Sequence, residues 1–313
     1  MSATHQVRTL EIPEGLDGER VDVALARALG FSRTMIASAA DRGAIHVNGK
    51  QVDKSARLSA GDVIDIEIIH DAARGPSIEI SDLSDLRIIH DDDDVVVIDK
   101  PLGVAAHPSI GWSGPTVVGI LMARGVTLSQ LAPTERAGIV HRLDVGTSGL
   151  MVVAKSDRAY QSLKEQFRER TVKKIYHAIV QGHPDPVRGT IDAPIDRHPR
   201  DEFKFAVVAD GKPSITHYQT LESFAGASLV EVELETGRTH QIRVHFAALR
   251  HPLVGDLMYG ADPTFAKALG LTRQWLHAYR LTFAHPADGQ ERSYTSAYPA
   301  DLEAALASLR KAT

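Results

Sequence analysis

The sequence contains no cysteine, and this absence removes several kinds of chemistry at once. Without thiols the chain cannot form disulfide bonds, bind zinc through thiolates or use a cysteine nucleophile. Any catalysis must therefore fall to carboxylate, imidazole, hydroxyl, ammonium or guanidinium groups. The sequence also lacks the glycine-rich GxGxxG and P-loop patterns, which argues against a bound dinucleotide or nucleoside triphosphate.

Long apolar stretches are missing as well. No segment reaches the roughly 18 apolar residues that a membrane-spanning helix needs. The opening MSATHQVRTLEIPEG has no basic start followed by an apolar core, so no secretory signal is predicted. We therefore expect a cytoplasmic protein without a membrane partner. With 313 residues, 43% of them hydrophobic, the chain can bury a substantial core and form two domains.

The net charge of −5 is distributed unevenly along the chain. Residues 1–94 hold 10 Lys and Arg against 18 Asp and Glu, a net of −8, whereas residues 95–313 hold 25 against 22, a net of +3. Local basic patches, rather than the charge of the whole chain, set the affinity for phosphate. The overall acidity therefore does not exclude a nucleic-acid partner.

Residues 18–72 are predicted to form a small module of two helices and short strands. Apolar residues recur at helical spacing after Asp17 or Asp22, either of which can cap the first helix, and Ser32 can cap the second. The pair Asn48-Gly49 lies between two β-rich segments. This pair favours a type I′ hairpin, because both turn positions need positive φ.

The stretch RVDVALARALGFSRTMIASAADRGAIHVNGKQVDKSARLSAGDVIDIEI resembles the S4 RNA-binding module, which has an αL-like fold. Between Arg27 and Arg57, six basic residues accompany two aspartates, a local net charge of +4 that suits an RNA backbone. A solvated helical face is the alternative explanation of this charge, and the resemblance favours RNA contact. The predicted RNA-binding residues are Arg27, Arg33, Arg42, Lys50, Lys54 and Arg57.

Residues 73–90 are predicted to be a linker that leads into the first strand of a second domain, residues 91–313. The run Asp91 to Asp94 could suggest a metal site, but adjacent carboxylates without spaced partners match no common metal motif. His240 and His245 are five residues apart, not the four that place two ligands on one helical face. We therefore predict no metal site.

The stretch GIVHRLDVGTSGLMVVAK, residues 138–155, carries the strongest signal in the second domain. Its apolar lead-in and the run Leu150 to Ala154 are predicted to be two strands that meet at a glycine-containing loop. His141, Arg142 and Asp144 lie at this loop, a common place for an active site. Capping of a turn is the usual role of an isolated Asp in such a position.

HRLDVGTSGL resembles the central motif of the pseudouridine synthases of the ribosomal large-subunit type. DDVVVIDKPLGVAAHP, TVKKIYHAIVQG and LETGRTHQIRVHFAALRHPLVGD resemble further motifs of the same family. The resemblance implies that Asp144 is the catalytic carboxylate, that Tyr176 lies against the target base, and that Arg243 pairs with Asp144. The predicted substrate-binding residues are Arg142, His141, Thr147, Arg238 and Gln241.

Local signals and the resemblance together predict an α+β protein. Helices are expected from Thr116 to Arg124, after Ser156 and Thr239 as N-caps, and from Asp301 to Lys311. The resemblance implies that the S4 module is followed by a catalytic domain with a mixed, mainly antiparallel sheet flanked by helices.

The predicted activity is the isomerisation of specific uridines to pseudouridine in large-subunit ribosomal RNA, without a cofactor. The expected partner is this RNA or the assembling ribosomal subunit, and the protein is expected to be a monomer. Asp144 could attack C1′ of the ribose or remove a proton from C2′, and the sequence leaves both routes open. Arg142 is the candidate to occupy the space of an extruded nucleotide.

Two other functions are alternatives to this activity. A non-catalytic RNA-binding or ribosome-assembly factor has no reason to keep Asp144, Tyr176 and Arg243 together. A glycoside hydrolase with Asp144 as nucleophile would need a second carboxylate, which the sequence does not show in a suitable pattern.

Overall fold

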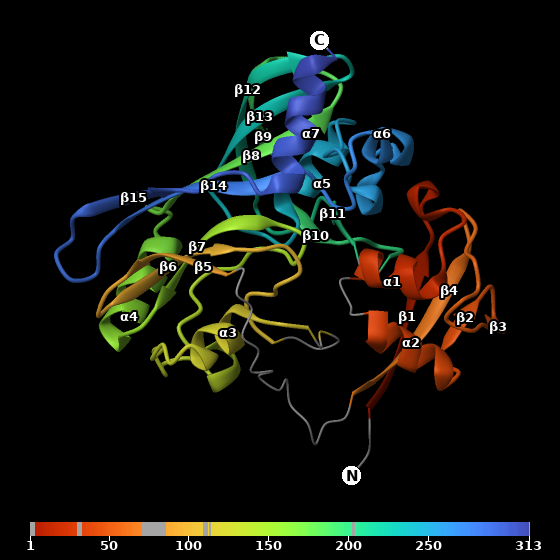
Figure 1. Cartoon of the computed structure of the whole chain (residues 1–313), viewed down its shortest axis with the longest axis horizontal. Coiled ribbons are helices and arrows are strands. Elements are labelled where there is room, and N and C mark those ends of the chain that lie inside the picture. The colour runs from red at the N-terminus through yellow and green to blue at the C-terminus, as the bar shows by residue number, and fades with distance from the viewer. Residues whose placement is uncertain are drawn as a thin grey trace.

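The computed structural model describes residues 4–29, 33–70, 86–108, 112, 114–201 and 204–312. The chain forms a small N-terminal module and a larger domain that lie side by side (Figure 1). The predicted linker falls mostly in residues 71–85, outside the described residues.

Two helices pack on a four-stranded antiparallel sheet, of order β1-β4-β2-β3, in the N-terminal module. Its elements are β1 (Thr4–Glu11), η1 (Glu14–Leu16), α1 (Val21–Leu29), α2 (Arg33–Asp41), β2 (Ile45–Val47), β3 (Lys50–Gln51) and β4 (Val63–His70). Leu25, Ile36 and Ile64 lie in its core. Because β1 pairs with β4 along its whole length, the module begins before the predicted boundary at residue 18.

The hairpin prediction for this module is confirmed, and the helix-cap prediction is wrong. Asn48 and Gly49 have φ of 49° and 76°, as a type I′ turn requires. Asp22 lies inside the first turn of α1, where its carboxylate accepts hydrogen bonds from two arginines. Asp17 instead accepts from a backbone N–H of a neighbouring loop. Ser32 lies outside the described residues.

The larger domain is built on a mixed sheet of nine strands, of order β5-β6-β7-β14-β8-β13-β12-β9, with β15 paired to β14. The strands are β5 (Arg87–Asp91), β6 (Val95–Lys100), β7 (Ser148–Ala154), β8 (Lys173–Gln181), β9 (Arg188–Asp192), β12 (Ile215–Phe224), β13 (Ala227–Leu234), β14 (Leu276–Ala284) and β15 (Glu291–Thr295). Among the described residues, β7 and β14 run parallel and the other neighbours run antiparallel. The predicted mixed, mainly antiparallel sheet is confirmed. A separate hairpin consists of β10 (Ile195–Arg197) and β11 (Phe205–Val207).

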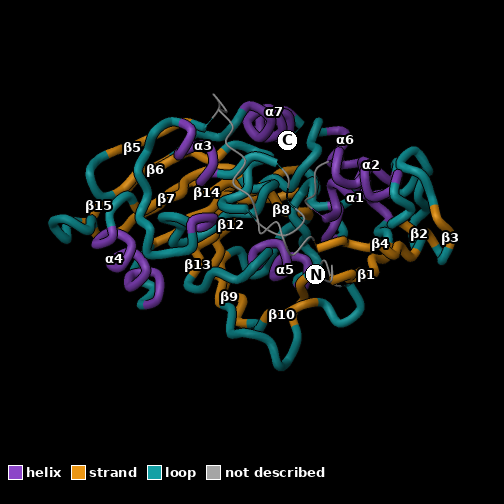
Figure 2. Tube along the Cα trace, turned by 90° about the horizontal axis from the view of Figure 1, so that it is seen from below, coloured by secondary structure: helices purple, strands orange, loops and turns teal. Residues whose placement is uncertain are grey.

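Helices cover both faces of this sheet (Figures 1 and 2). α3 (Val117–Ala123) and α5 (Gln241–Ala248) pack on one face, and α4 (Asp157–Arg168) and α7 (Ala300–Lys311) pack on the other. Successive residues of β7 alternate between the two cores, because side chains along a strand point to opposite faces. The shorter helices are η2 (Thr134–Arg136), η3 (Leu257–Tyr259) and α6 (Pro263–Ala268). No helix among these described segments is long and apolar enough to span a membrane.

Local predictions near the central stretch had mixed outcomes. Ser156 is an N-cap, as predicted, and Thr116, expected as the first residue of a helix, is an N-cap as well; they accept hydrogen bonds from backbone N–H groups at 3.1 and 3.0 Å. Thr239 is not a cap, because α5 begins after His240, whose φ is 56°. The lead-in to HRLD is not a strand, since Ile139 forms only an isolated bridge to Val153. Asp144 therefore precedes one strand, β7, rather than joining two.

Candidate active site

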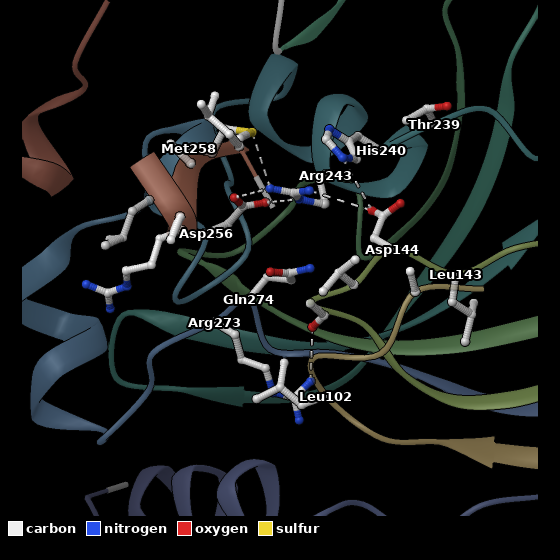
Figure 3. A pocket seen from close by; sticks show the side chains of 18 of the residues that line it. Leu102, Leu143, Asp144, Thr239, His240, Arg243, Asp256, Met258, Arg273 and Gln274 are labelled. Carbon is white, nitrogen blue, oxygen red and sulfur yellow. Dashed lines mark hydrogen bonds and ion pairs between the residues drawn. The ribbon is translucent and has the colours of Figure 1, made fainter. Parts of the chain in front are cut away.

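The Asp144 loop opens into a pocket of about 480 Å³ where the two domains meet (Figure 3). α1 of the N-terminal module forms part of its wall, opposite residues of the larger domain. The lining includes Arg27, Leu29, Leu102, Arg142, Asp144, Arg197, Phe205, His240 and Arg243. Asp256 lines the pocket too, so two carboxylates lie there among several cationic side chains.

Arg243 lies on α5 and contacts two carboxylates. Its Nε and Nη2 donate to the two oxygens of Asp256 at 2.7 and 2.9 Å. Its third nitrogen, Nη1, lies 3.6 Å from Oδ2 of Asp144. Arg243 and Asp144 are therefore an ion pair, but the two-pronged hydrogen bond expected from an arginine goes to Asp256.

His240 also faces Asp144, and the sequence reasoning did not single out this contact. Its Nε2 lies 3.9 Å from Asp144 Oδ2, and its Nδ1 lies 2.8 Å from the Tyr259 hydroxyl. That hydroxyl accepts a hydrogen bond from the Phe205 N–H at 3.1 Å, so its own proton can be donated to Nδ1. This assignment places the imidazole proton on Nε2, toward Asp144. Burial, and then the charge of Arg243, lowers the pKa of His240 to about 4, so the ring is neutral at pH 7.

The surroundings keep Asp144 ionised. Burial acts to raise the pKa of its carboxyl group, but His240, Arg243, Arg142 and Lys100 oppose this effect, and the net shift is downward. The carboxylate accepts no hydrogen bond from the residues that the structure describes, and its side chain is 18% exposed to the pocket. Its charge therefore depends on nearby cations rather than on direct donors.

Lys100 is a fully buried cation behind this loop. Its Nζ donates to the Pro101 and Val104 carbonyls at 3.0 and 2.8 Å, which fixes the turn that follows β6. Burial lowers the pKa of Lys100 to about 7, against the opposing effect of the Asp144 charge. The Lys-Pro-Leu-Gly segment thus supports the floor of the pocket.

Tyr176 lies on β8 and is 7% exposed. It lines a smaller cavity of about 70 Å³ together with Asp144 and Thr147. Burial, and then the negative charge of Asp144, raises the pKa of the Tyr176 phenol, so it is neutral at physiological pH. Tyr176 and Asp144 therefore face the same small cavity, and contact of the ring with a target base stays a prediction.

His141 is among the lining residues of neither cavity, whereas Gln241 lines the smaller one. His141 stacks on Phe167 with ring centroids 4.7 Å apart, and its Nε2 accepts from the Val152 N–H at 3.1 Å. Burial lowers its pKa to about 3, so this ring is a neutral structural group. The Gln241 amide is 2% exposed and uses its oxygen and its nitrogen in hydrogen bonds to the β12 region and to the Arg238 N–H. His141 thus supports the loop from within the protein, and the substrate contact of Gln241 stays a prediction.

The other three predicted substrate residues lie at the site. Arg142 is exposed and lines both cavities. Thr147 is buried, and its hydroxyl accepts from the Gln274 amide at 3.4 Å. Arg238 lines the smaller cavity, and its Nε donates to a backbone carbonyl at 3.3 Å. Of these, Arg142 has the most freedom to meet a substrate.

All six predicted RNA-binding residues of the N-terminal module are exposed. They differ in position, since Arg27 lines the Asp144 pocket and pairs with Glu19 at 3.1 Å. Arg33 pairs with Asp22 at 2.8 Å, and Lys54 pairs with Asp41 at 3.3 Å. Hydrogen bonds hold Arg42 and Arg57, and Lys50 lies beside the hairpin turn. Their contact with RNA stays a prediction.

The aspartate run was predicted to have no spaced partners, and this expectation is wrong. The aspartate run does have spaced partners, because His90 and His285 both lie within hydrogen-bonding distance of Asp92 Oδ2, at 2.7 and 2.9 Å. The Ala287 N–H donates to His285 Nδ1 at 3.3 Å, which leaves the imidazole proton on Nε2 for Asp92. This arrangement suits a hydrogen-bonded link between β5 and the β14–β15 hairpin. His245 likewise has a hydrogen-bond partner at each ring nitrogen, the Thr216 hydroxyl at Nδ1 and a backbone carbonyl at Nε2.

The chain belongs to the RNA pseudouridine synthase family. Residues 94–248 match the family model described as RNA pseudouridylate synthase, and residues 19–64 match the S4 domain. The protein is accordingly an RNA pseudouridine synthase with an N-terminal S4 module. Helix α1 of this module lines the Asp144 pocket.

Similar proteins support this membership. An uncharacterized RNA pseudouridine synthase of Mycobacterium tuberculosis is 57% identical, and the match covers 97% of this chain and 98% of that protein. Ribosomal large subunit pseudouridine synthase D of Nitrosomonas europaea is 40% identical over 96% of this chain and 87% of its own length. The solved structure of human RNA pseudouridylate synthase domain containing 1 is 30% identical, with a TM-score of 0.58 over 72% of this chain and 90% of that chain.

Proposed function

We propose that the protein isomerises specific uridines of large-subunit ribosomal RNA to pseudouridine, with Asp144 as the catalytic carboxylate and without a cofactor. The observation that carries this proposal is the ionised Asp144 carboxylate, which opens into the interdomain pocket 3.6 Å from a buried arginine. The ribosomal substrate is supported by the relatives named ribosomal large subunit pseudouridine synthase D.

The reaction breaks the bond between C1′ and N1 of the uracil, forms a bond between C1′ and C5, releases the C5 proton to water and protonates N1, so that the product is an isomer of uridine. Asp144 can attack C1′ to give a covalent ribosyl intermediate, or it can take a C2′ proton to give a glycal and later return it. Either route requires an ionised carboxylate, and the nearby charges keep Asp144 in that form. No electrons are exchanged with another reactant.

Other residues have supporting roles in this proposal. Arg243 maintains the charge and orientation of Asp144 through their ion pair. Tyr176 offers the uracil a neutral aromatic surface beside the carboxylate. Arg142, exposed at the pocket, fills the space left by the extruded nucleotide. The six basic residues of the S4 module contact the RNA backbone.

The structure also bears on the glycoside-hydrolase alternative, because it places a second carboxylate, Asp256, near Asp144. Both oxygens of Asp256 accept hydrogen bonds from Arg243. A retaining hydrolase needs a protonated acid that is free to reach the leaving group. Asp256 does not meet this requirement.

Tritium at C5 of the target uracil provides the test. Wild-type protein should release the label to water from ribosomal RNA, including after treatment with a chelator, and the RNA should keep its mass. Asp144→Asn removes the negative charge and keeps the size of the side chain, so release should stop while RNA affinity stays within about twofold. Asp210→Asn, in an exposed turn, is the matched control and should release label at the wild-type rate.

Release by purified Asp144→Asn protein would refute the role of Asp144. A wild-type protein that binds the RNA and releases no label would support the non-catalytic alternative. Release of a free base or sugar would support a hydrolase.

A further inference from the structure

The S4 module and Arg243 are joined by one short segment, residues 256–259. On one side, Leu257 and Met258 pack against the hydrophobic core of the S4 module. η1 lies directly on η3, and Gly15 is so close that a Cβ atom there would lie 2.9 Å from Leu257 Cβ. Gly15 has no positive φ, so its lack of a side chain serves this close approach rather than a turn.

On the other side, the same segment holds Arg243 by three contacts. Asp256 accepts both hydrogen bonds of the guanidinium fork at 2.7 and 2.9 Å. Met258 Sδ lies 3.7 Å from Arg243 Nη2, and the Tyr259 ring centroid lies 4.8 Å from the guanidinium carbon. Figure 3 shows Asp256 and Met258 on one side of Arg243 and Asp144 on the other. The position of Arg243 is therefore set by the segment on which the S4 module rests.

Asp144 is sensitive to that position. It accepts no hydrogen bond from the described residues, so its charge is balanced through space, and the Arg243 contact at 3.6 Å is the nearest ion pair to it. A displacement of the guanidinium by even 1 Å changes such an interaction in a buried pocket. The other ionisable groups that influence Asp144 are His240, Arg142 and Lys100, and Tyr176 faces it across the smaller cavity.

We propose that the docked S4 module is a positioning element of the active site, which holds Asp256 and thereby Arg243 against Asp144 through the contact of η1 with η3. This inference rests on the proposed catalytic role of Asp144. It assigns to Gly15 and Leu257 a role in the rate of the chemical step, beyond the contribution of the S4 module to RNA affinity.

Gly15→Val tests the proposal in the full-length protein, because the added carbons must push η3 away without touching a catalytic group. Gly15→Ala is the gentler version, since its single Cβ already meets Leu257 below ordinary contact distance. Ala60→Val is the matched control, at an exposed position of the same module. It adds two carbons, which is the difference in size between Gly15→Val and Gly15→Ala. Thermal unfolding of each variant identifies any that fail to fold, and Gly15→Ala then serves alone.

Three quantities are measured for each variant: the single-turnover rate of tritium release at saturating RNA, the RNA dissociation constant, and amide hydrogen exchange in residues 256–261. The rate should fall about fivefold for Gly15→Ala and at least tenfold for Gly15→Val, with the dissociation constant within about threefold. Amide hydrogen exchange at Tyr259 and Ala261, whose N–H groups donate to the Asp256 carbonyl, should be faster in the same variants than in wild type. Ala60→Val should match wild type in all three.

The pH profile adds a readout that a purely structural or affinity role would not change. Arg243 helps to keep the pKa of Asp144 low, and activity is present above this pKa and lost as pH falls through it. When Arg243 is displaced, the loss should begin at a higher pH. Wild-type rates at saturating RNA with an unchanged acidic limb would overturn the proposal, whether or not exchange increased. A wild-type protein that releases no tritium would instead refute the proposed function itself.

Discussion

Two buried arginines of the catalytic domain have nearly the same geometry and different surroundings. Arg243 binds Asp256 with hydrogen bonds of 2.7 and 2.9 Å, and Arg273 binds Asp301 with hydrogen bonds of the same lengths. The two guanidinium groups differ in the partner of their third nitrogen, Nη1. In Arg273, Nη1 donates to the Gly146 carbonyl and the Ser148 hydroxyl at 3.3 and 3.2 Å.

In Arg243, by contrast, Nη1 faces the Asp144 carboxylate at 3.6 Å across the pocket. Arg273 thus donates all its hydrogen bonds to groups within the protein and links the end of the Asp144 loop to α7. Arg243 instead directs one nitrogen at Asp144, the proposed catalytic carboxylate. An identical arginine–aspartate fork can therefore be structural or functional, and the partner of the third nitrogen decides which.

The largest contrast is expected when the carboxylate of each fork is neutralised. Asp256 is 1% exposed, so Asp256→Asn leaves the Arg243 charge unpaired in a buried site and should lower the free energy of unfolding by about 3–5 kcal/mol. Asp301 is 38% exposed, and water can replace much of its interaction, so Asp301→Asn should cost about 1 kcal/mol. Urea unfolding measures both. Equal losses would show that the burial of the carboxylate does not separate the two forks.

The arginines themselves should differ in turnover. Arg243→Lys keeps a charge but cannot satisfy Asp256 and face Asp144 together, and turnover at saturating RNA should fall about a hundredfold. Arg273→Lys should reduce turnover per folded molecule by less than about threefold, because its partners are structural. RNA affinity should change little in either variant. A comparable fall in both would mean that support of the loop, and not the charge at Asp144, limits the reaction.

Lys100 sharpens the comparison because its charge, unlike that of either arginine, changes within an accessible pH range. Its pKa is lowered to about 7 in the folded protein from 10.5, so the unfolded chain binds more protons between these values. Stability should therefore rise with pH from 7 to 10, by at most about 1.4 kcal/mol per pH unit from this group. Lys100→Met should remove this rise in urea unfolding at pH 7, 8 and 9. The exposed Lys173→Met is the control, and an unchanged slope in Lys100→Met would contradict the assignment.

Sequence patterns predicted the features that depend on neighbouring residues. The Asn48-Gly49 hairpin and the Ser156 cap are set within three or four residues, so local chemistry identifies them. The motif strings likewise brought Asp144, Tyr176 and Arg243 into one site, although they lie far apart in the chain.

The errors arose where a distant segment decides the role of a side chain. HRLD suggested that His141 would face substrate, but its ring stacks on Phe167 of α4. Asp256 and His240 were missed as neighbours of Arg243 and Asp144, because no local pattern shows which carboxylate an arginine will choose. Leu257 and Met258 showed no sign that they contact another domain.

The contact of η1 with η3 also has a consequence for the order of events during protein synthesis. It joins a segment that ends at residue 16 to one that begins at residue 257. A ribosome adds about 5–20 residues per second, so the roughly 240 intervening residues take on the order of 10–50 s to emerge. The S4 module is therefore complete and exposed long before its docking segment exists. During that interval the surface of η1 that later contacts η3 is exposed, and Arg243 does not yet have Asp256 as its partner.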